Sequence, residues 1–432
     1  MTPITPDATG QTPHDESHAL ALDASDPLRR FRERFHIPKR PDGSPVTYFA
    51  GHSLGLQPKT TAAAIQRELN DWAAMGVDGH FKKETPWYSY HELLREPLAR
   101  LVGAHPDEVA AMNSLTVNLH LMMVTFYRPT RDRHKIVMED AAFPSDTYAV
   151  KSQLRYHGFD PADGMIVVKP RPGEFAIRTD DVEQLLRDRG HEIALVMLGG
   201  VNYFTGQLFD MPRIAAAAKS AGCVVGYDLA HAAGNVPVAL HDWGVDFAVW
   251  CSYKYLNGGP GAVAGCFVHR DHGANADLHR FAGWWGNDPK TRFRMHLQPE
   301  FVPRPGADGW QISNPPIFSL APVAASLALF DEAGMVALRD KSRRLTGYMC
   351  DLLDRRADGV VRIITPREPD ARGCQISMLV NDHPRERLSA LHAAGVVCDF
   401  REPNVLRAAP VPLYNTFHDV WRFVQALART IQ

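Results

Sequence analysis

The sequence predicts an α/β fold with a large domain, built on a mostly parallel β-sheet flanked by helices, and a smaller α+β domain at the C-terminal end. Three observations carry this prediction. The chain has 432 residues, more than one hydrophobic core usually organises. Short apolar runs alternate with amphipathic stretches through its middle, as in sheets whose strands are joined by helices. After Pro315 and Pro316 the pattern changes to long helices followed by strands.

The elements follow in order along the chain. Residues 1–25 are rich in Thr, Pro, Asp and His, and we expect a flexible leader. Residues 26–60 are expected to pack on the small domain, residues 61–315 to form the large domain and residues 316–432 the small one. Helical spacing covers residues 60–76, with Gly76 as a C-cap.

Strands of the large domain are predicted at residues 108–112, 135–139, 165–169, 193–198, 223–228, 247–251 and 265–269. Helical patterns between several of them cover residues 115–126, 145–157, 179–188 and 212–221. The C-terminal part shows helices at 320–333 and 335–356, strands at 374–380 and 397–402, and a last helix at 417–431.

Composition excludes several classes of protein. The apolar fraction of 45% and the charged fraction of 22% are ordinary for globular proteins, and a net charge of −2 gives no field for nucleic acid or a membrane surface. No apolar stretch reaches the ~20 residues of a membrane span, and no secretory signal is visible. The six cysteines are scattered without a C-x-x-C pair, which favours buried free thiols over metal sites or disulfides. We expect a cytoplasmic protein that binds no nucleic acid, membrane or metal.

Two residues at neighbouring strand ends carry the chemistry. Asp228 closes the run 223–228, and Lys254 lies in the polar cluster after the next strand. Sheets of this type bind ligands beyond the carboxyl ends of their strands. A lysine that forms an imine and a carboxylate that pairs with a pyridinium nitrogen suit pyridoxal 5′-phosphate (PLP). Alone, Asp228 is as readily a cap or loop carboxylate, and Lys254 a surface charge.

Longer motifs make the prediction of a PLP site more specific. The segments YDLAHAAGN, HDWGVDF and CSYKYLN begin at Tyr227, His241 and Cys251. The chain also contains GHSLGLQP, NSLTVNLH, FPSD, GW, ISNPP and APVPLYN, which begin at residues 51, 113, 143, 283, 312 and 409. In this order they resemble kynureninase, from about Tyr48 to near the C-terminus.

The resemblance implies a PLP enzyme of fold type I that forms a homodimer with active sites shared between subunits. It implies Lys254 as the Schiff-base lysine and Asp228 as the partner of the pyridine nitrogen. Tyr253 is implied as a phosphate contact and a candidate for proton transfer. His231 is expected near the cofactor, with a purely structural role as the open alternative.

Further cofactor contacts come from the same resemblance. Leu115 and Thr116 match the phosphate-binding turn, at a helix start where N–H groups attract an anion; Ser114 could equally be an ordinary N-cap. Phe143 matches the aromatic that stacks on the pyridine ring, and Asp146 a second cofactor contact. Trp284 and Asn314 are expected from the partner subunit. Without the resemblance, Phe143 and Trp284 would be core aromatics.

The substrate pocket is implied in the same way. Arg407 corresponds to the clamp of the substrate α-carboxylate, a role that suits a guanidinium; otherwise it would be a surface residue. Substrate contacts are also expected from Ser53, His80, Ser313 and Asn314. His80 and Ser313 could instead cap loops. Three of these polar side chains, His80, Ser313 and Asn314, predict a preference for a hydroxylated ring.

One residue departs from the expected pattern. Gly199 stands where relatives can have serine near the cofactor, which leaves cofactor affinity open. The implied reaction is hydrolytic Cβ–Cγ cleavage of L-kynurenine or 3-hydroxy-L-kynurenine to L-alanine and an anthranilate. The alternatives are another activity on the same scaffold, such as a cysteine desulfurase or an aminotransferase, and a catalytically silent PLP-fold binding protein.

Overall fold

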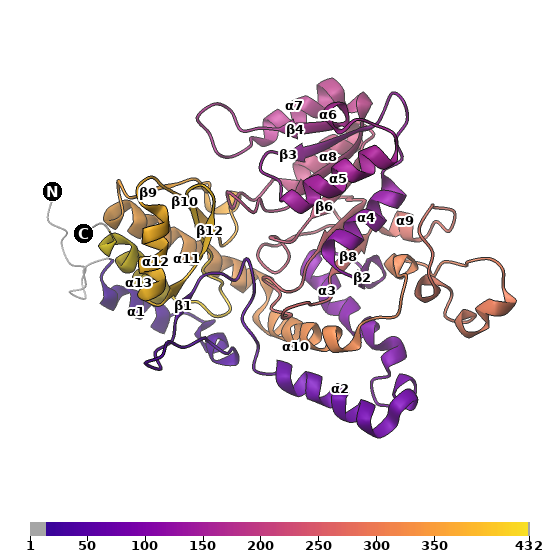
Figure 1. Cartoon of the computed structure of the whole chain (residues 1–432), viewed down its shortest axis with the longest axis horizontal. Helices are drawn as coiled ribbons and strands as arrows, with labels where there is room; N and C mark the ends of the chain where they lie inside the picture. The colour runs from indigo at the N-terminus through magenta and orange to yellow at the C-terminus, as the bar shows by residue number, and fades with distance from the viewer. Residues whose placement is uncertain (1–13, 431–432) are drawn as a thin grey trace.

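The computed structural model describes residues 14–430 and shows two bodies of unequal size side by side (Figure 1). The larger contains a seven-stranded sheet in the order β2-β8-β7-β6-β5-β3-β4. Its strands are β2 Val109–Ala111, β3 Lys135–Glu139, β4 Met165–Val168, β5 Ile193–Gly199, β6 Val224–Asp228, β7 Phe247–Trp250 and β8 Gly265–Val268. From β4 to β7 neighbouring strands are parallel, and only β8 runs antiparallel to both of its neighbours. The prediction of a mostly parallel sheet is confirmed.

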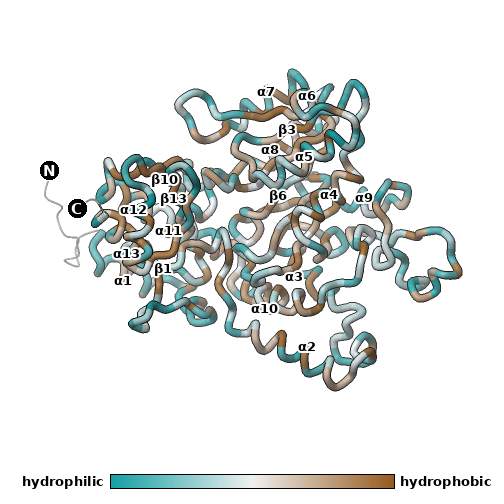
Figure 2. Tube along the Cα trace, viewed as in Figure 1, coloured by the Kyte–Doolittle hydropathy of each residue, from teal (hydrophilic) through white to brown (hydrophobic). Residues whose placement is uncertain are grey.

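Helices cover both faces of this sheet because alternate side chains of the central strands are apolar in both directions. In β5, Leu195 and Met197 belong to the cluster that includes α4 and α5, whereas Val196 and Leu198 belong to the cluster that includes α7 and α8. Figure 2 shows hydrophobic residues gathered along these strands. The helices of this body are α3 Arg95–Val102, α4 Leu115–Phe126, α5 Pro144–Tyr156, α6 Pro161–Gly164, α7 Thr179–Arg189, α8 Met211–Ser220 and α9 Arg270–Gly273.

The smaller body has an antiparallel sheet in the order β12-β13-β10-β9. Its elements are α11 Met335–Arg356, β9 Val361–Ile363, β10 Ile376–Val380, α12 Pro384–Ala393, β11 Val396–Val397, β12 Asp399–Arg401, β13 Val405–Ala408 and α13 Phe417–Arg429. The predicted strand at 397–402 is thus two short strands, and β9 and β13 were missed. All four of these strands are four residues long or shorter, too short for a clear periodic pattern.

The N-terminal segment contacts this smaller body. Strand β1 (Thr47–Tyr48) pairs in parallel with β11, and Asp26 forms a buried ion pair of 2.7 Å with Lys341 of α11. The expectation of a flexible leader fails for residues 16–24, which form helix α1 (Glu16–Ala24); residues 1–13 lie outside the described part. The helix forms because it docks on α13, where the Asp23 carboxylate accepts hydrogen bonds from the backbone of Phe417 and His418.

Two long helices pack on each other along the larger body (Figure 1). Helix α2 (Thr61–Met75) lies against α10 (Ile317–Ala333), which also contacts α3 (Figure 1). The break predicted around residues 313–316 is confirmed, since α10 begins directly after it. Helix α10 nevertheless packs with helices of the large body, because its apolar side chains Leu320, Val323 and Leu327 join the main core. The packing therefore changes from the large to the small body between α10 and α11.

Short 3₁₀ helices complete the described elements: η1 Arg29–Arg34, η2 Gly76–His80, η3 Trp87–Leu94, η4 Pro106–Glu108, η5 Gly190–Glu192, η6 Trp284–Gly286, η7 Arg292–Leu297, η8 Ala307–Trp310 and η9 Pro369–Ala371. Within residues 14–430 no single helix is long and apolar enough to cross a membrane; α10 and α11 pass that test only as a pair bent by 80°.

Candidate active site

A cavity lies at the carboxyl ends of strands β3, β5 and β6, where parallel sheets of this kind bind ligands. It encloses about 500 Å³, part of which is open to solvent. Its lining comes from strand ends, from the first turns of α4 and α5, and from the loops after β6 and β7. The lining residues are Leu115, Thr116, Glu139, Phe143, Asp146, Gly199, Val201, Tyr203, Asp228, Ala230, His231, Tyr253 and Lys254.

The structure brings together most of the cofactor contacts that the sequence predicts. Eight of the ten predicted residues line this one cavity, although they come from segments up to 139 positions apart in the chain. They are Leu115, Thr116, Phe143, Asp146, Asp228, His231, Tyr253 and Lys254.

Lys254 is a buried amine with one polar neighbour of note. Its Nζ lies 3.1 Å from Nε2 of His231 and over the rings of Phe143 and Tyr253, at 5.6 and 5.9 Å from their centroids. Burial, and next the charge of Lys254, hold the pKa of His231 well below its usual range. A neutral imidazole therefore faces the amine. The other ring nitrogen of His231, Nδ1, is buried without a hydrogen-bond partner.

Carboxyl groups also line the cavity. Asp228 ends β6, and its Oδ1 accepts a hydrogen bond of 2.7 Å from the backbone N–H of Ala230. Asp146 lies in the first turn of α5, with its Oδ1 buried and without a partner. Burial, and next the charge of Asp228, raise the pKa of Asp146 well above its usual range. These two acids thus approach each other inside the cavity.

The first turns of two helices form another wall. Helix α4 begins at Leu115, and its N-cap residue Ser114 makes no side-chain capping bond, so the ordinary N-cap alternative is not what the structure shows. Thr116 Oγ1 lies 3.0 Å from Oγ of Ser145 in α5. An uncapped helix N-terminus with hydroxyl groups beside it attracts phosphate through its N–H groups and dipole.

These residues fit PLP. Phe143 is 40% exposed and faces the cavity, so its ring is available for stacking rather than buried in the core. The partnerless Asp146 Oδ1 and His231 Nδ1 are buried polar atoms, which proteins rarely leave unsatisfied unless a ligand completes them. The amine of Lys254, the carboxylate of Asp228 and the α4 N-terminus match the aldehyde, ring nitrogen and phosphate of the cofactor in turn.

Arg407 lies close to the cavity but does not line it. From β13 its Nη1 donates to the backbone carbonyl of Tyr203 at 2.6 Å, and its guanidinium carbon lies 5.6 Å from the Tyr203 ring centroid. Nε and Nη2 both bind Oδ1 of Asp399. Tyr203 in turn contacts Phe143 edge to face, with 5.2 Å between centroids. Arg407 is therefore one aromatic ring away from the predicted cofactor.

The remaining predicted residues lie outside the cavity of this chain. Ser53, Ser313 and Asn314 are exposed, and His80 is half-buried in η2, edge to face with Trp87 at 5.4 Å. Trp284 is 36% exposed at the start of η6, so it is no core aromatic. The contacts of Trp284 and Asn314 with a partner subunit stay predictions.

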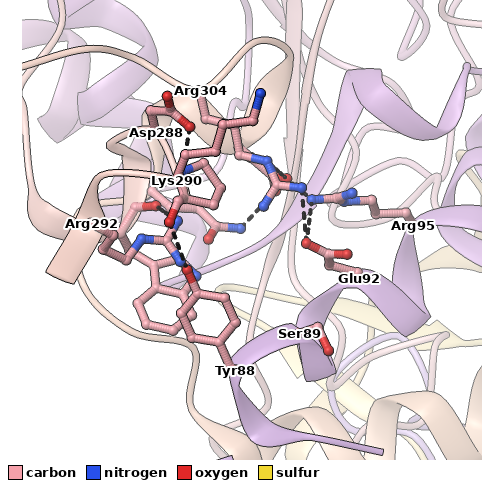
Figure 3. A network of polar contacts seen from close by, with 12 residues as sticks. Tyr88, Ser89, Glu92, Arg95, Asp288, Lys290, Arg292 and Arg304 are labelled. Carbon is pink, nitrogen blue, oxygen red and sulfur yellow. Dashed lines mark hydrogen bonds and ion pairs between the residues drawn. The ribbon is translucent and has the colours of Figure 1, made fainter. Parts of the chain in front are cut away.

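A polar network holds the segment after Trp284 against η3 (Figure 3). Glu92 accepts a hydrogen bond of 2.8 Å from Arg304, and a longer one of 3.3 Å from Arg95. The guanidinium of Arg292 lies over the rings of Trp285 and Tyr88, at 4.3 and 5.1 Å from their centroids. The segment after Trp284 is thus held to η3 at Arg292 and at Arg304.

Sequence reasoning missed three residues at the site. Glu139 lines the cavity from the end of β3, and Tyr203 lines it from the loop after β5. His52 is buried with both ring nitrogens unpartnered, 6.3 Å from the His231 ring. His52 lies beside Ser53 in the motif GHSLGLQP, and Glu139 is the last residue of a predicted strand. Motif position could therefore have indicated His52, and its place at a strand end could have indicated Glu139.

Comparisons with known proteins bear on this geometry. A family model for the kynureninase C-terminal domain matches residues 338–427. A kynureninase of Myxococcus xanthus is 58% identical over 412 residues, covering 95% of this chain and 96% of the relative. One from Salinispora tropica is 54% identical, covering 97% and 98%. The chain belongs to the kynureninase family. It is a PLP-dependent hydrolase that acts on carbon–carbon bonds, and the predicted family and cofactor are confirmed.

Solved structures show the fold. The cysteine desulfurase CsdA of Escherichia coli superposes with a TM-score of 0.76 at 18% identity, covering 94% of this chain and 98% of that one. A C-DES mutant with glycine covalently linked to its PLP cofactor gives a TM-score of 0.75 at 17% identity, with coverage of 92% and 98%. The predicted PLP fold type I is confirmed.

Proposed function

We propose that the protein hydrolyses the Cβ–Cγ bond of L-kynurenine and 3-hydroxy-L-kynurenine, giving L-alanine and anthranilate or 3-hydroxyanthranilate. The observation that carries the proposal is the Lys254 amine, 3.1 Å from a neutral His231 in a cavity that Asp228 also lines. High identity to curated kynureninases over nearly the whole chain supports the same activity.

Each residue of the cavity has its own role in the proposed reaction. When bound, PLP supplies an electron sink for the substrate α-carbon. Asp228 holds the proton on the ring nitrogen, and Leu115 and Thr116 hold the phosphate. Lys254 moves the proton at the substrate α-carbon, since it is the basic group of the cavity.

Tyr253 supplies a proton at the β-carbon. Burial, and next the neighbouring Cys251 thiol, raise the pKa of its phenol above the usual range, so the group stays protonated and can donate. Water adds to the γ-carbonyl, the Cβ–Cγ bond breaks, the β-carbon takes up the proton of Tyr253, and one proton of the added water returns to the phenol. Arg407 binds the α-carboxylate and keeps the substrate in the orientation that this sequence of steps needs.

A homodimer completes the site in this proposal. Trp284 and Asn314 are exposed on one protomer and stand outside its own cavity, which supports a role at the site of a partner. Ser53, His80 and Ser313 contribute to the substrate pocket in the assembled protein. We propose further that the enzyme works in the cytoplasm, where its cysteines, all six of them free and buried, stay reduced.

One experiment tests the proposal. Purified protein is incubated with PLP and L-kynurenine or 3-hydroxy-L-kynurenine, while anthranilate fluorescence and L-alanine are measured. We expect both products in equal amounts, and none from Lys254→Ala. Release of sulfide from L-cysteine without any cleavage of a kynurenine would instead make the protein a desulfurase. Cofactor absorption with turnover of neither substrate would make it a silent binding protein.

A further inference from the structure

The cavity holds more acidic groups than the cofactor's ring nitrogen needs. Three carboxyl groups line it, those of Glu139, Asp146 and Asp228, against one lysine amine. Three carboxylates and one ammonium in a largely buried space cannot all stay charged, because like charges at short range in a low dielectric repel strongly. Burial therefore favours a proton on at least one of the three acids.

Glu139 is placed differently from the other two. It ends β3 and is 6% exposed, and both of its carboxyl oxygens lie 3.2 Å from the backbone N–H of Gly199 at the end of β5. A Cβ atom at position 199 would lie only 2.9 Å from Oε1 of Glu139. The glycine therefore makes the room in which this carboxyl group sits, where a side chain at position 199 would force it to move.

The surroundings of Glu139 favour its neutral form. Burial raises its pKa to about 7; the hydrogen bond from the Gly199 backbone lowers the pKa and so opposes burial, whereas the charge of Asp228 raises it. Glu139 forms no ion pair within the described residues. The titratable groups that share the cavity with it are Asp146 from α5, Asp228 from β6, His231 after β6, and Tyr253 and Lys254 after β7.

We propose that Glu139 is a positioning residue for the ring nitrogen of the cofactor: its buried carboxyl group, seated against the backbone N–H of Gly199, sets how much negative charge lies in the cavity around the group that binds this nitrogen. The inference rests on the PLP site proposed above and adds a residue to it. Ionisation of Glu139 at higher pH adds a negative charge to the cavity. The visible absorption of the bound cofactor is then expected to change in the same pH range, because the ring nitrogen responds to nearby charge.

Infrared difference spectroscopy of the holoenzyme tests this directly, since a protonated carboxylic acid has its own C=O band. We expect a band at about pH 5.5 that fades through about pH 7 and is gone at about pH 8.5. Glu139→Gln should lose this band and the accompanying change in cofactor absorption. Glu386→Gln, which replaces an exposed glutamate of α12, is the matched control and should keep both.

Gly199→Ala provides a second variant that keeps the carboxyl group but displaces it. We expect the midpoint of the infrared titration to shift by at least half a pH unit, roughly threefold in proton affinity. A band that still fades through about pH 7 in Glu139→Gln would place that titration on another carboxyl group and overturn the proposal, as would an unchanged midpoint in Gly199→Ala. Neither the infrared band nor the cofactor absorption requires turnover. Failure to hydrolyse kynurenine would therefore refute the proposed reaction without affecting the assignment of Glu139.

The unliganded protein gives an independent readout. A carboxyl group whose pKa is higher in the folded than in the unfolded chain stabilises the fold below its ordinary pKa of 4.5 and loses that contribution as pH rises to about 7. Glu139→Gln removes this dependence. The melting temperature of Glu139→Gln minus that of the unmodified protein should therefore rise across this window, and a flat difference would contradict the assignment.

Discussion

Arg407, which is buried, and Asp399, which is partly buried, form an ion pair in which Nη2 and Nε of the guanidinium lie 2.7 and 3.0 Å from the same carboxylate oxygen. A third nitrogen, Nη1, donates to the carbonyl of Tyr203. The face of the guanidinium that suits a bidentate carboxylate is therefore already occupied by Asp399. A substrate carboxylate that binds Arg407 must share or replace this partner, so Asp399 sets how strongly Arg407 attracts it.

Replacing either member of this pair should change substrate binding in opposite directions. Arg407→Ala should raise KM by roughly 10²-fold, because the substrate carboxylate then has no cationic partner, and losing one partner of a buried charge pair costs about 2–5 kcal/mol. Asp399→Asn keeps an acceptor oxygen and removes the competing charge, so its KM should fall several-fold. Steady-state kinetics with L-kynurenine measure both values. A higher KM for Asp399→Asn would mean that Asp399 orients the guanidinium for substrate rather than competing with it.

Lys254→Ala should abolish both turnover and the covalent link to PLP. The expectation follows from the place of this amine beside His231 and over the Phe143 ring, in the cavity that fits the cofactor. Treatment with borohydride followed by mass spectrometry should find the reduced cofactor on Lys254 in the unmodified protein and nowhere in the variant. A borohydride-stable adduct on another lysine would disprove the assignment.

Asp228→Ala should bind cofactor but react slowly. Without this carboxylate the ring nitrogen loses its proton, and removal of one electrostatic partner in a closed site typically lowers the rate by roughly 10²–10⁴. Deuterium exchange at the substrate α-carbon, followed by NMR, isolates that step. If exchange continues at a normal rate, Asp146, whose unpartnered oxygen faces the same cavity, holds the proton instead.

Particular residues show which parts of the fold and of the site could be predicted from the sequence. Asp228 and Lys254 could be placed at strand ends because alternating apolar runs predict the sheet, and the edge of a parallel sheet then fixes which residues meet. All seven strands of the large sheet were located within about two residues. Helix α1 could not be predicted, since it has one buried residue and forms only by docking on α13.

The pairing of Arg407 with Asp399 was beyond sequence reasoning for another reason. The two residues lie on neighbouring strands, of which β13 was not predicted and β12 was predicted only as part of a longer strand at 397–402, so their register could not be derived. Glu139 was missed because a glutamate at the end of an apolar strand reads as a solvent-facing boundary. Its burial depends on Gly199, 60 positions away, and on the space that a missing side chain leaves.

The contact of the N-terminal segment with α11 can be tested through stability. Asp26 and Lys341 are 2% and 4% exposed, and their charged groups lie 2.7 Å apart. Lys341→Met should lower the free energy of unfolding by about 3–5 kcal/mol, because Asp26 is then buried without its partner. Urea unfolding followed by circular dichroism measures the loss. The double variant Lys341→Met with Asp26→Leu should recover most of it, and an equally unstable double variant would show that the ion pair is not the cause.

The final prediction concerns the aromatic ring of the substrate: kcat/KM should be higher for 3-hydroxy-L-kynurenine than for L-kynurenine. His80, Ser313 and Asn314 are polar side chains that we expect to face the ring in the assembled dimer, and none of them is fully buried in the single chain. Once closed around substrate, such groups lose water and need the ring hydroxyl as a partner, and each unpaired group costs about 1–3 kcal/mol, or roughly tenfold per contact. Parallel assays of both substrates measure the ratio. Asn314→Thr, which keeps a hydroxyl but loses the amide, should reduce it, whereas the exposed control Glu386→Gln should not. A ratio in favour of L-kynurenine would refute the preference, and an unchanged ratio in Asn314→Thr would remove that residue from its cause.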